Sequence, residues 1–196
     1  MGTTGLFRSG HVDTFARDNL PPREQWPEFK FTLPELQYPE RLNCVTHWVD
    51  RWVEAGQGAK PCLLSPGEEL TYAQLNERVN RIANVLTRDF GLVPGNRVLL
   101  RAPNNPMMVA AYFAVIKAGG VVVATMPLLR AKELSYPLAK AKIGLALCDA
   151  RLADEMEKAK AESSELKRVV YWGSGNPDAL EALMNKPGYD KFTACD

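Results

Sequence analysis

Residues that could act as nucleophiles, general bases or metal ligands are few in this sequence and lie far apart. There are two histidines and four cysteines, at His11, His47, Cys44, Cys62, Cys148 and Cys195. Neither histidine accompanies a G-x-S-x-G motif, and no two cysteines have C-x-x-C spacing. These residues therefore predict no catalytic triad, no metal site and no disulfide framework, and four reduced thiols are the simpler interpretation.

Glycine-rich loops that hold phosphate have characteristic spacings, and this sequence lacks them. The sequence contains neither G-x-x-x-x-G-K-[ST] nor a G-x-G-x-x-G that follows an expected strand. Gly173-Ser174-Gly175 does follow such a strand, but Asn176-Pro177 stands where a helix would have to begin. We interpret it as a surface turn. The residue types alone thus predict a well-specified fold with no catalytic and no nucleotide-binding residue.

Composition and charge are those of an ordinary globular protein. Hydrophobic residues make up 46% and charged residues 24%, and 24 Lys and Arg against 23 Asp and Glu leave a net charge of +1. Because the basic residues are scattered, neither nucleic acid nor a membrane is an expected partner. The longest apolar stretch, residues 107–125, is interrupted by Lys117 and Gly119-Gly120, and no leader peptide is visible, so we expect a cytoplasmic protein.

Hydrophobic periodicity predicts alternating strands and helices from residue 61 onward. Strands are expected at residues 61–65, 97–101, 121–125, 145–148 and 168–172, the third of them buried on both faces. Helices are expected at residues 43–56, 107–118, 131–141, 151–162 and 178–185, and from a capping box at Thr71 and Gln74 to Gly91. Residues 65–68 are expected to form a turn. This alternation predicts an α/β fold, a mostly parallel sheet with helices on both faces.

The two ends of the chain differ from its middle. Residues 1–42 hold five prolines and several aromatic residues, which predict an extended arm that wraps over a larger body. Residues 43–186 are expected to form that body. Residues 187–196 have no recognisable pattern and are expected to be a tail at a truncation point.

Three stretches, in this order, resemble the opening of the adenylate-forming (AMP-binding) ligases. The first is Leu70–Leu75, which runs on to Asn80–Ala83 and resembles a capped "LTY-x-x-L … N-x-x-A" helix. The others are Gly95–Val98 with Asn104–Pro106, similar to "GD-x-V … N", and Ile116–Pro127, similar to "K-x-GA … PL". Asn96 replaces the commoner Asp, and Thr125-Met126-Pro127 departs from the usual "P-x-x-P" ending.

The arm gives a finer resemblance. Residues His11–Asp18, with Leu20-Pro21-Pro22 and Trp26-Pro27, are similar to the leader of 2-aminobenzoate-CoA ligases within the benzoate-CoA ligase group. The resemblance implies a parent enzyme that converts a small carboxylic acid, ATP and coenzyme A to acyl-CoA, AMP and pyrophosphate through an acyl-adenylate. It implies ATP, Mg²⁺ and coenzyme A as cofactors of that parent.

In the family, the phosphate loop, the adenine and ribose contacts and the catalytic lysine all lie downstream of this region. We therefore expect an inactive N-terminal fragment whose partner is the missing part of its own chain, with an exposed truncation face through which dimers could form. The resemblance places one loop at the edge of a coenzyme A tunnel, and the alternative is a tight turn shaped by Pro127. That loop consists of Met126, Pro127, Leu128, Leu129 and Arg130.

Two other classes of protein remain open on the sequence alone. A dehydrogenase-type nucleotide-binding domain fits the alternation, although the glycine fingerprint and its ribose-binding acid are missing. A stand-alone scaffold or interaction module with a degenerate ligase fold fits as well. The scaffold predicts a natural end near Asp196 and no orphaned apolar face, whereas truncation predicts such a face.

Overall fold

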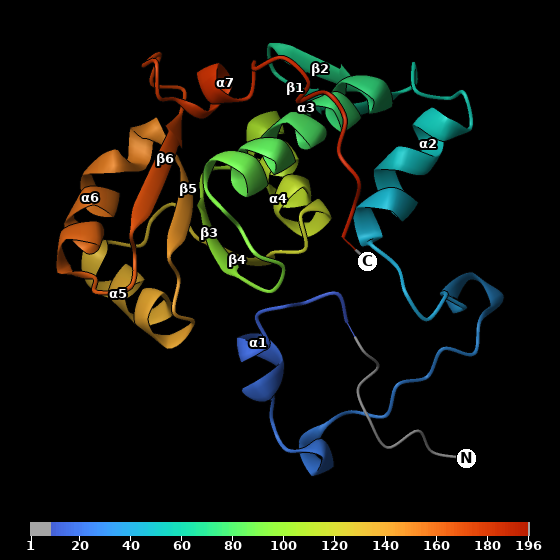
Figure 1. The fold of residues 1–196 in the computed structure, drawn as a ribbon, viewed down its shortest axis with the longest axis horizontal. Helices are drawn as coiled ribbons and strands as arrows, with labels where there is room; N and C mark the ends of the chain where they lie inside the picture. Colours follow the sequence, from blue (N-terminus) through green and yellow to red (C-terminus); the bar gives the residue numbers. More distant parts are fainter. Residues whose placement is uncertain (1–8, 196) are drawn as a thin grey trace.

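A four-stranded parallel sheet between two layers of helices forms the body of the computed structural model, which describes residues 9–195 (Figure 1). The strands are β3 (Arg97–Arg101), β4 (Val121–Thr125), β5 (Leu145–Asp149) and β6 (Arg168–Trp172), in the order β4-β3-β5-β6. All three pairs of neighbours are parallel. The predicted α/β class is confirmed, with each of these strands within one residue of its expected place.

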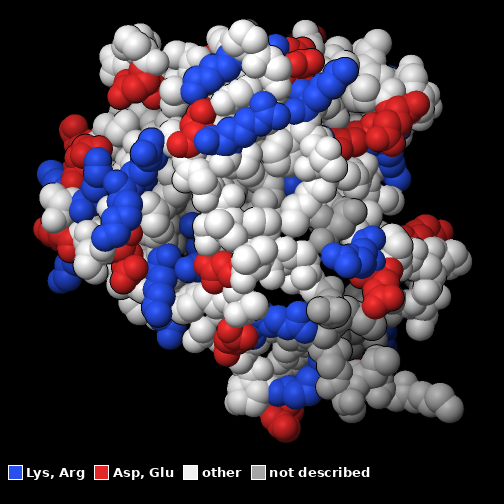
Figure 2. Space-filling model, viewed as in Figure 1, with Lys and Arg blue, Asp and Glu red and all other residues white. Residues whose placement is uncertain are grey.

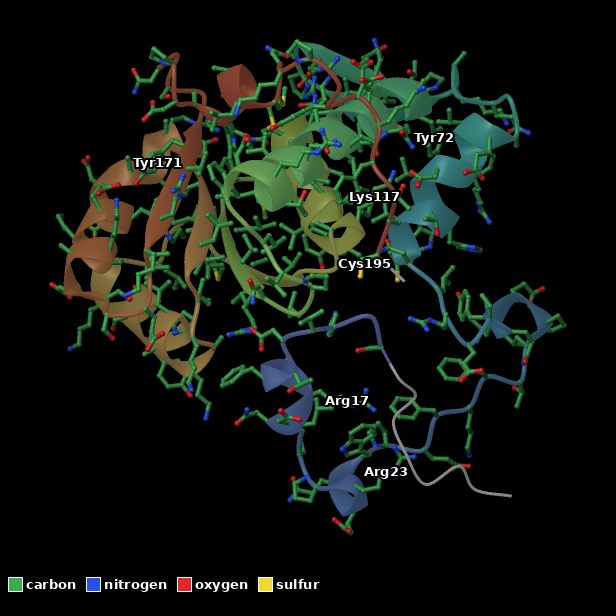
Figure 3. The ribbon with its side chains drawn as sticks, viewed as in Figure 1. Arg17, Arg23, Tyr72, Lys117, Tyr171 and Cys195 are labelled. Atoms are coloured by element: carbon green, nitrogen blue, oxygen red, sulfur yellow. The ribbon has the colours of Figure 1, made fainter. Side chains whose placement is uncertain are left out.

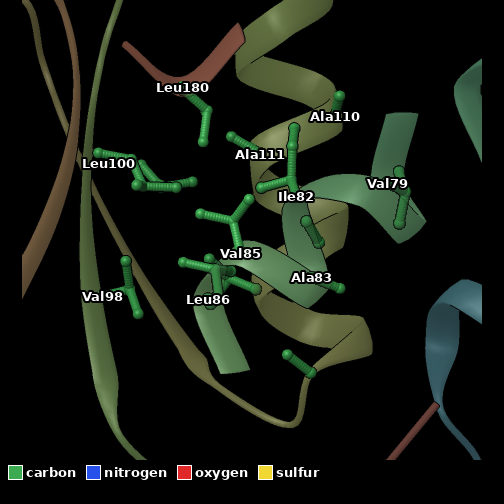
Figure 4. Packing of buried hydrophobic residues seen from close by; sticks show 14 of the residues in the cluster. Val79, Ile82, Ala83, Val85, Leu86, Val98, Leu100, Ala110, Ala111 and Leu180 are labelled. Atoms are coloured by element: carbon green, nitrogen blue, oxygen red, sulfur yellow. The ribbon is translucent and has the colours of Figure 1, made fainter. Parts of the chain in front are cut away.

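One face of the sheet is covered by α3 (Tyr72–Asn84), which runs on as a π-helical turn at Val85–Asp89, and by α4 (Pro106–Lys117). The predicted capping box begins α3, since the backbone N–H of Gln74 donates to Thr71 Oγ1 and the N–H of Thr71 donates to Gln74 Oε1. Figure 4 shows the cluster that results, in which side chains of α3 and α4 pack on β3.

The other face is covered by α5 (Ala131–Lys140) and α6 (Ala153–Glu162), which follows a 3-10 turn at Ala150–Leu152. Strand β3 separates the two clusters because its side chains alternate. Val98 and Leu100 belong to the first cluster, and Leu99 belongs to the second. All five residues of β3 are buried, as expected for a strand with helices on both sides.

Two expectations about strands are wrong. Val121–Thr125 was expected to be buried on both faces, but β4 is an edge strand that is only half-buried, with Ala124 exposed. The expected turn at residues 65–68 is shorter, because Glu68 already begins a strand. That strand, β2 (Glu68–Thr71), pairs antiparallel with β1 (Pro61–Ser65) around Pro66-Gly67, where Gly67 has a φ of 82°.

The segment before β1 contains a π-helical turn at Thr46–Asp50 that leads into α2 (Arg51–Glu54), within the helix expected at residues 43–56. A buried lysine, Lys117 at the end of α4, joins this segment to α3. Its Nζ donates to Asp50 Oδ1 and to Asn80 Oδ1, each at 2.7 Å. These two acceptors stabilise an ammonium group that burial alone would disfavour.

The segment after α7 (Leu180–Leu183) crosses back over α3 and α4, although the sequence showed no pattern there. Asn80 and Asn84 donate to backbone carbonyls of residues 189–191, and Asn43 donates to the carbonyl of Cys195. Figure 3 shows Cys195 close to Lys117, whose carbonyl accepts from the Cys195 N–H at 3.0 Å. Three asparagine amides therefore fix this segment to the body.

The N-terminal arm lies beside the body, and it contains α1 (Phe15–Asp18) and 3-10 turns at Arg23–Gln25 and Pro34–Leu36 (Figure 1). The backbone N–H groups of Val12 and Asp13 donate to the carbonyl of Pro94, which anchors the start of the arm.

The surface of the body and arm carries both signs of charge. Figure 2 shows Lys and Arg atoms interleaved with Asp and Glu atoms over the face in view. No helix in the described part of the chain has the length and apolar character needed to cross a membrane.

The capping box of α3 gives a first prediction. We expect Thr71→Ala to lower the free energy of unfolding by about 1 kcal/mol, because the N–H of Gln74 loses its acceptor. Urea denaturation followed by circular dichroism measures this change. Thr71→Ser keeps the hydroxyl and is the control, and an equal loss in both variants would contradict the role of the cap.

Candidate functional site

The carboxyl ends of the parallel strands form the edge at which ligands bind in open α/β sheets. A ligand binds where the connections that follow two neighbouring strands turn to opposite faces of the sheet. Here the chain leaves β3 through α4 on one face, and it leaves β5 through α6 on the other. The loops at residues 102–105 and 149–152 therefore diverge at this point.

Asp149, at the end of β5, provides the charge at this point. Arg151 binds it through two hydrogen bonds, from Nε to Oδ1 at 2.8 Å and from Nη2 to Oδ2 at 2.7 Å. Asn105 Nδ2 lies 3.4 Å from Oδ2, while its own Oδ1 caps α4 by accepting from the N–H of Met108. The hydrogen bonds from Arg151 lower the pKa of Asp149 and outweigh the opposing effect of burial. Asp149 is therefore an ionised group that can accept hydrogen bonds.

Arg101, at the end of β3, organises the loop formed by residues 126–130. Its side chain is 2% exposed and donates to three carbonyls: Nη1 to Met126 at 3.1 Å, and Nη2 to Pro127 at 3.0 Å and Leu129 at 2.5 Å. No carboxylate of the described residues forms an ion pair with it. The loop carbonyls thus replace the water that a buried guanidinium would lose.

The predicted loop presents apolar side chains outward. Leu128 is 82% exposed and Met126 is 62% exposed, whereas the carbonyls of Met126, Pro127 and Leu129 accept from the buried Arg101. At the end of the loop, the N–H of Arg130 donates to Glu133 Oε2 at 2.7 Å, and α5 begins. The structure therefore shows a turn with a fixed backbone and a free apolar tip. Its place at the edge of a coenzyme A tunnel stays a prediction.

A cavity of about 300 Å³ lies near this edge, between the β1–β2 hairpin and the start of α4. Leu63, Leu64 and Pro66 line one wall, and Asn104, Asn105 and Val109 line the other. Leu64 is 73% exposed. Together with Met126 and Leu128, it gives this edge three exposed apolar side chains.

The nucleophiles and bases considered from the sequence lie in other surroundings. Cys148 is buried in β5, and burial raises its pKa to about 12, so its thiol stays protonated at neutral pH. His47 lies 3.3 Å from Arg51, and His11 belongs to the arm. All four cysteines are free, and within residues 9–195 no group of three or more His, Cys, Asp and Glu could hold a metal ion.

Sequence reasoning overlooked Arg101 as a site residue. The available signal was a charged residue at the end of an otherwise apolar strand, Val98-Leu99-Leu100. Which carbonyls it binds depends on β4 pairing with β3 and is not visible in the sequence.

The parallel sheet and the loops at its carboxyl edge are those of an α/β domain that binds ligands at the carboxyl ends of its strands. Residues 49–191 match the family model of the AMP-binding enzyme, and the chain belongs to that family. Benzoate–CoA ligase of Thauera aromatica is 28% identical over 163 residues, covering 83% of this chain and 31% of that protein. Salicyl-AMP ligase of Mycobacterium tuberculosis is 38% identical over 108 residues, covering 55% and 18%.

A solved structure supports the fold. The crystal structure of the anthranilate CoA ligase AuaEII in complex with anthranoyl-AMP has a TM-score of 0.74 at 21% identity, and the match covers 81% of this chain and 30% of that one. The chain therefore spans about a third or less of the length of these relatives.

The contacts of Arg101 give the second prediction. We expect Arg101→Met to speed hydrogen exchange of the Leu129 amide by about tenfold or more, because the loop carbonyls lose their shared donor. That amide donates to Met126 O at 3.2 Å. Mass spectrometry of a peptide covering residues 126–130 measures it, and a peptide covering β5 is the control. Unchanged exchange in the loop would show that its turn holds without Arg101.

Proposed function

We propose that this chain is the N-terminal part of an AMP-forming acyl- or aryl-CoA ligase. The observation that carries the proposal is the family match over residues 49–191, together with aryl-CoA ligases among the relatives. The reaction joins a carboxylate to the α-phosphorus of ATP, releases pyrophosphate, and then transfers the acyl group from AMP to the thiol of coenzyme A.

We propose an aryl acid, benzoate or 2-aminobenzoate, as the substrate. Benzoate–CoA ligase covers 83% of this chain, and the AuaEII structure is that of an anthranilate CoA ligase. The arm supports the same choice through the resemblance of His11–Asp18 to the leader of 2-aminobenzoate-CoA ligases.

The described residues suit one of the three expected cofactors. Exposed Met126 and Leu128, followed by the cationic Arg130, match the chemistry of coenzyme A, which has a pantetheine arm with apolar segments between its amides and also has phosphate groups. In this proposal Arg101 fixes the backbone of the loop, and the side chains at the tip of the loop contact the pantetheine arm. The other two expected cofactors are ATP and Mg²⁺, and among residues 9–195 no group of three or more His, Cys, Asp and Glu could hold the metal ion. Those cofactors belong to the downstream part, and the chain alone is expected to be inactive.

The exposed apolar side chains at the carboxyl edge support the proposal that a partner covers this edge. Leu64, Met126 and Leu128 are each more than half exposed. Apolar surface of this kind is commonly covered by another part of a protein. We propose the downstream part of the same chain as the natural cover, and a second copy of the chain when that part is missing.

The reading frame beyond Asp196 and the activity of its product test the proposal. We expect the frame to continue, and its full product to catalyse ATP–pyrophosphate exchange with benzoate or 2-aminobenzoate faster than with octanoate. The purified chain of 196 residues should show no exchange. Exchange by this chain alone would contradict its inactivity, and a frame that ends near Asp196 would favour the scaffold alternative.

A second test concerns association of the chain. We expect Leu128→Ser to weaken dimers by about tenfold or more, because burying a leucine side chain contributes about 2 kcal/mol. Sedimentation velocity measures the dissociation constant. Tyr136→Ser is the control, since Tyr136 is 70% exposed on α5. Equal weakening by both variants, or none by Leu128→Ser, would place the contact elsewhere.

A further inference from the structure

A cleft of about 390 Å³ lies at the amino edge of the sheet, opposite the candidate site. It is formed where β3, β5 and β6 begin, beside the segment that follows α3. Its lining includes the ring of Phe90 and four basic residues, Arg97, Lys142, Lys167 and Arg168. A strand of five residues is about 16 Å long, so the cleft is separate from the loop at residues 126–130.

Three of the four basic groups have no carboxylate partner. Within the described part of the chain, no ion pair joins Lys142, Lys167 or Arg168 to Asp or Glu. Arg97 is the exception, because it pairs with Asp13 of the arm. Burial opposes ionisation of Asp13, but hydrogen bonds from Phe15 N–H, Arg97 and Asn96 outweigh it and lower its pKa. The cleft therefore keeps a local excess of positive charge at neutral pH.

These three basic groups have partners that carry no charge: Lys142 Nζ lies 5.2 Å from the centre of the Phe15 ring, and Lys167 Nζ donates to the carbonyl of Ser164. The Arg168 guanidinium carbon lies 4.6 Å from the centre of the Phe90 ring, which orients its plane. Lys142 has a φ of 47° and is the only described residue other than glycine with positive φ. It follows Ala141, the C-cap residue of α5, at a position where glycine is the usual residue. A lysine at this position provides a positive charge that glycine would lack, but its backbone is strained. Strain of this kind is common at functional sites.

We propose that this cleft binds a small oligophosphate anion, a ligand class separate from the proposed ligase chemistry at the other edge. Lys142, Lys167 and Arg168 supply three positive charges around one cavity, which favours a compact anion of several charges. Arginine offers paired N–H groups and lysine a point charge, and both suit phosphate oxygens. The volume is in the range of small-molecule sites, and a polymer would not fit inside it.

Isothermal titration of the chain with inorganic pyrophosphate and tripolyphosphate, without Mg²⁺ and at about 0.15 M salt, tests the proposal. We expect tripolyphosphate to bind more tightly. Lys142→Gly should weaken binding about tenfold, because a charge-assisted hydrogen bond is lost. The same variant should raise the melting temperature, since glycine relieves the positive φ. A residue with only a structural role would not combine weaker binding with a more stable fold.

Three further variants, two in the cleft and one outside it, keep the result interpretable. Lys167 and Arg168 are exposed, so Lys167→Gln and Arg168→Gln should retain the circular dichroism spectrum while weakening binding. Lys140→Gln removes an equal charge from the last turn of α5, outside the cleft, and should leave affinity unchanged. Absence of binding, equal weakening by Lys140→Gln, or equally tight binding of single-stranded DNA would overturn the proposal.

Discussion

Strand β3 has to bury every residue it contains, including an arginine at each end. Its apolar middle divides between two hydrophobic clusters, so helices must cover both faces of the sheet at this strand. A guanidinium cannot lose its proton at neutral pH, and a buried one needs hydrogen-bond acceptors. Arg97 and Arg101 therefore dictate the backbone around them. Much of the architecture at both edges of the sheet follows from this requirement.

The two arginines meet the requirement in different ways. Arg97 binds the carbonyls of Gly95, Ala141 and Lys142 and also the carboxylate of Asp13, so its charge is neutralised and the arm is fixed to the body. Arg101 binds only carbonyls, which are dipoles and not charges. Its Nε is buried without a partner in the described part of the chain. Among the described residues, carbonyl dipoles alone therefore offset the charge of Arg101.

Local signals in the sequence were sufficient for most of the body. The capping box at Thr71, the helix expected at residues 107–118 and the strand expected at residues 121–125 depend on a few neighbouring residues, and each element appears within one residue of its expected place. The errors concern long-range relations. Hydrophobicity cannot tell that β4 lies at an edge, because this depends on which strand pairs beside it. The fixed terminal segment was missed because its partners, Asn43, Asn80 and Asn84, are more than a hundred residues away in sequence.

The difference between local signals and long-range contacts also explains which residues of the candidate site could be predicted from the sequence. The loop at residues 126–130 was named through a resemblance, whereas the group that holds it, Arg101, belongs to a strand that precedes it by 25 residues. The two edges of the sheet then differ in kind. At the amino edge the chain closes over Arg97 with its own arm and leaves charged side chains in water, where they are well solvated. At the carboxyl edge it leaves Leu64, Met126 and Leu128 in water, where their exposure is unfavourable. The two edges therefore offer different surfaces, a basic cleft at the amino edge and exposed apolar side chains at the carboxyl edge, and the second is the surface that the proposed downstream part of the chain would cover.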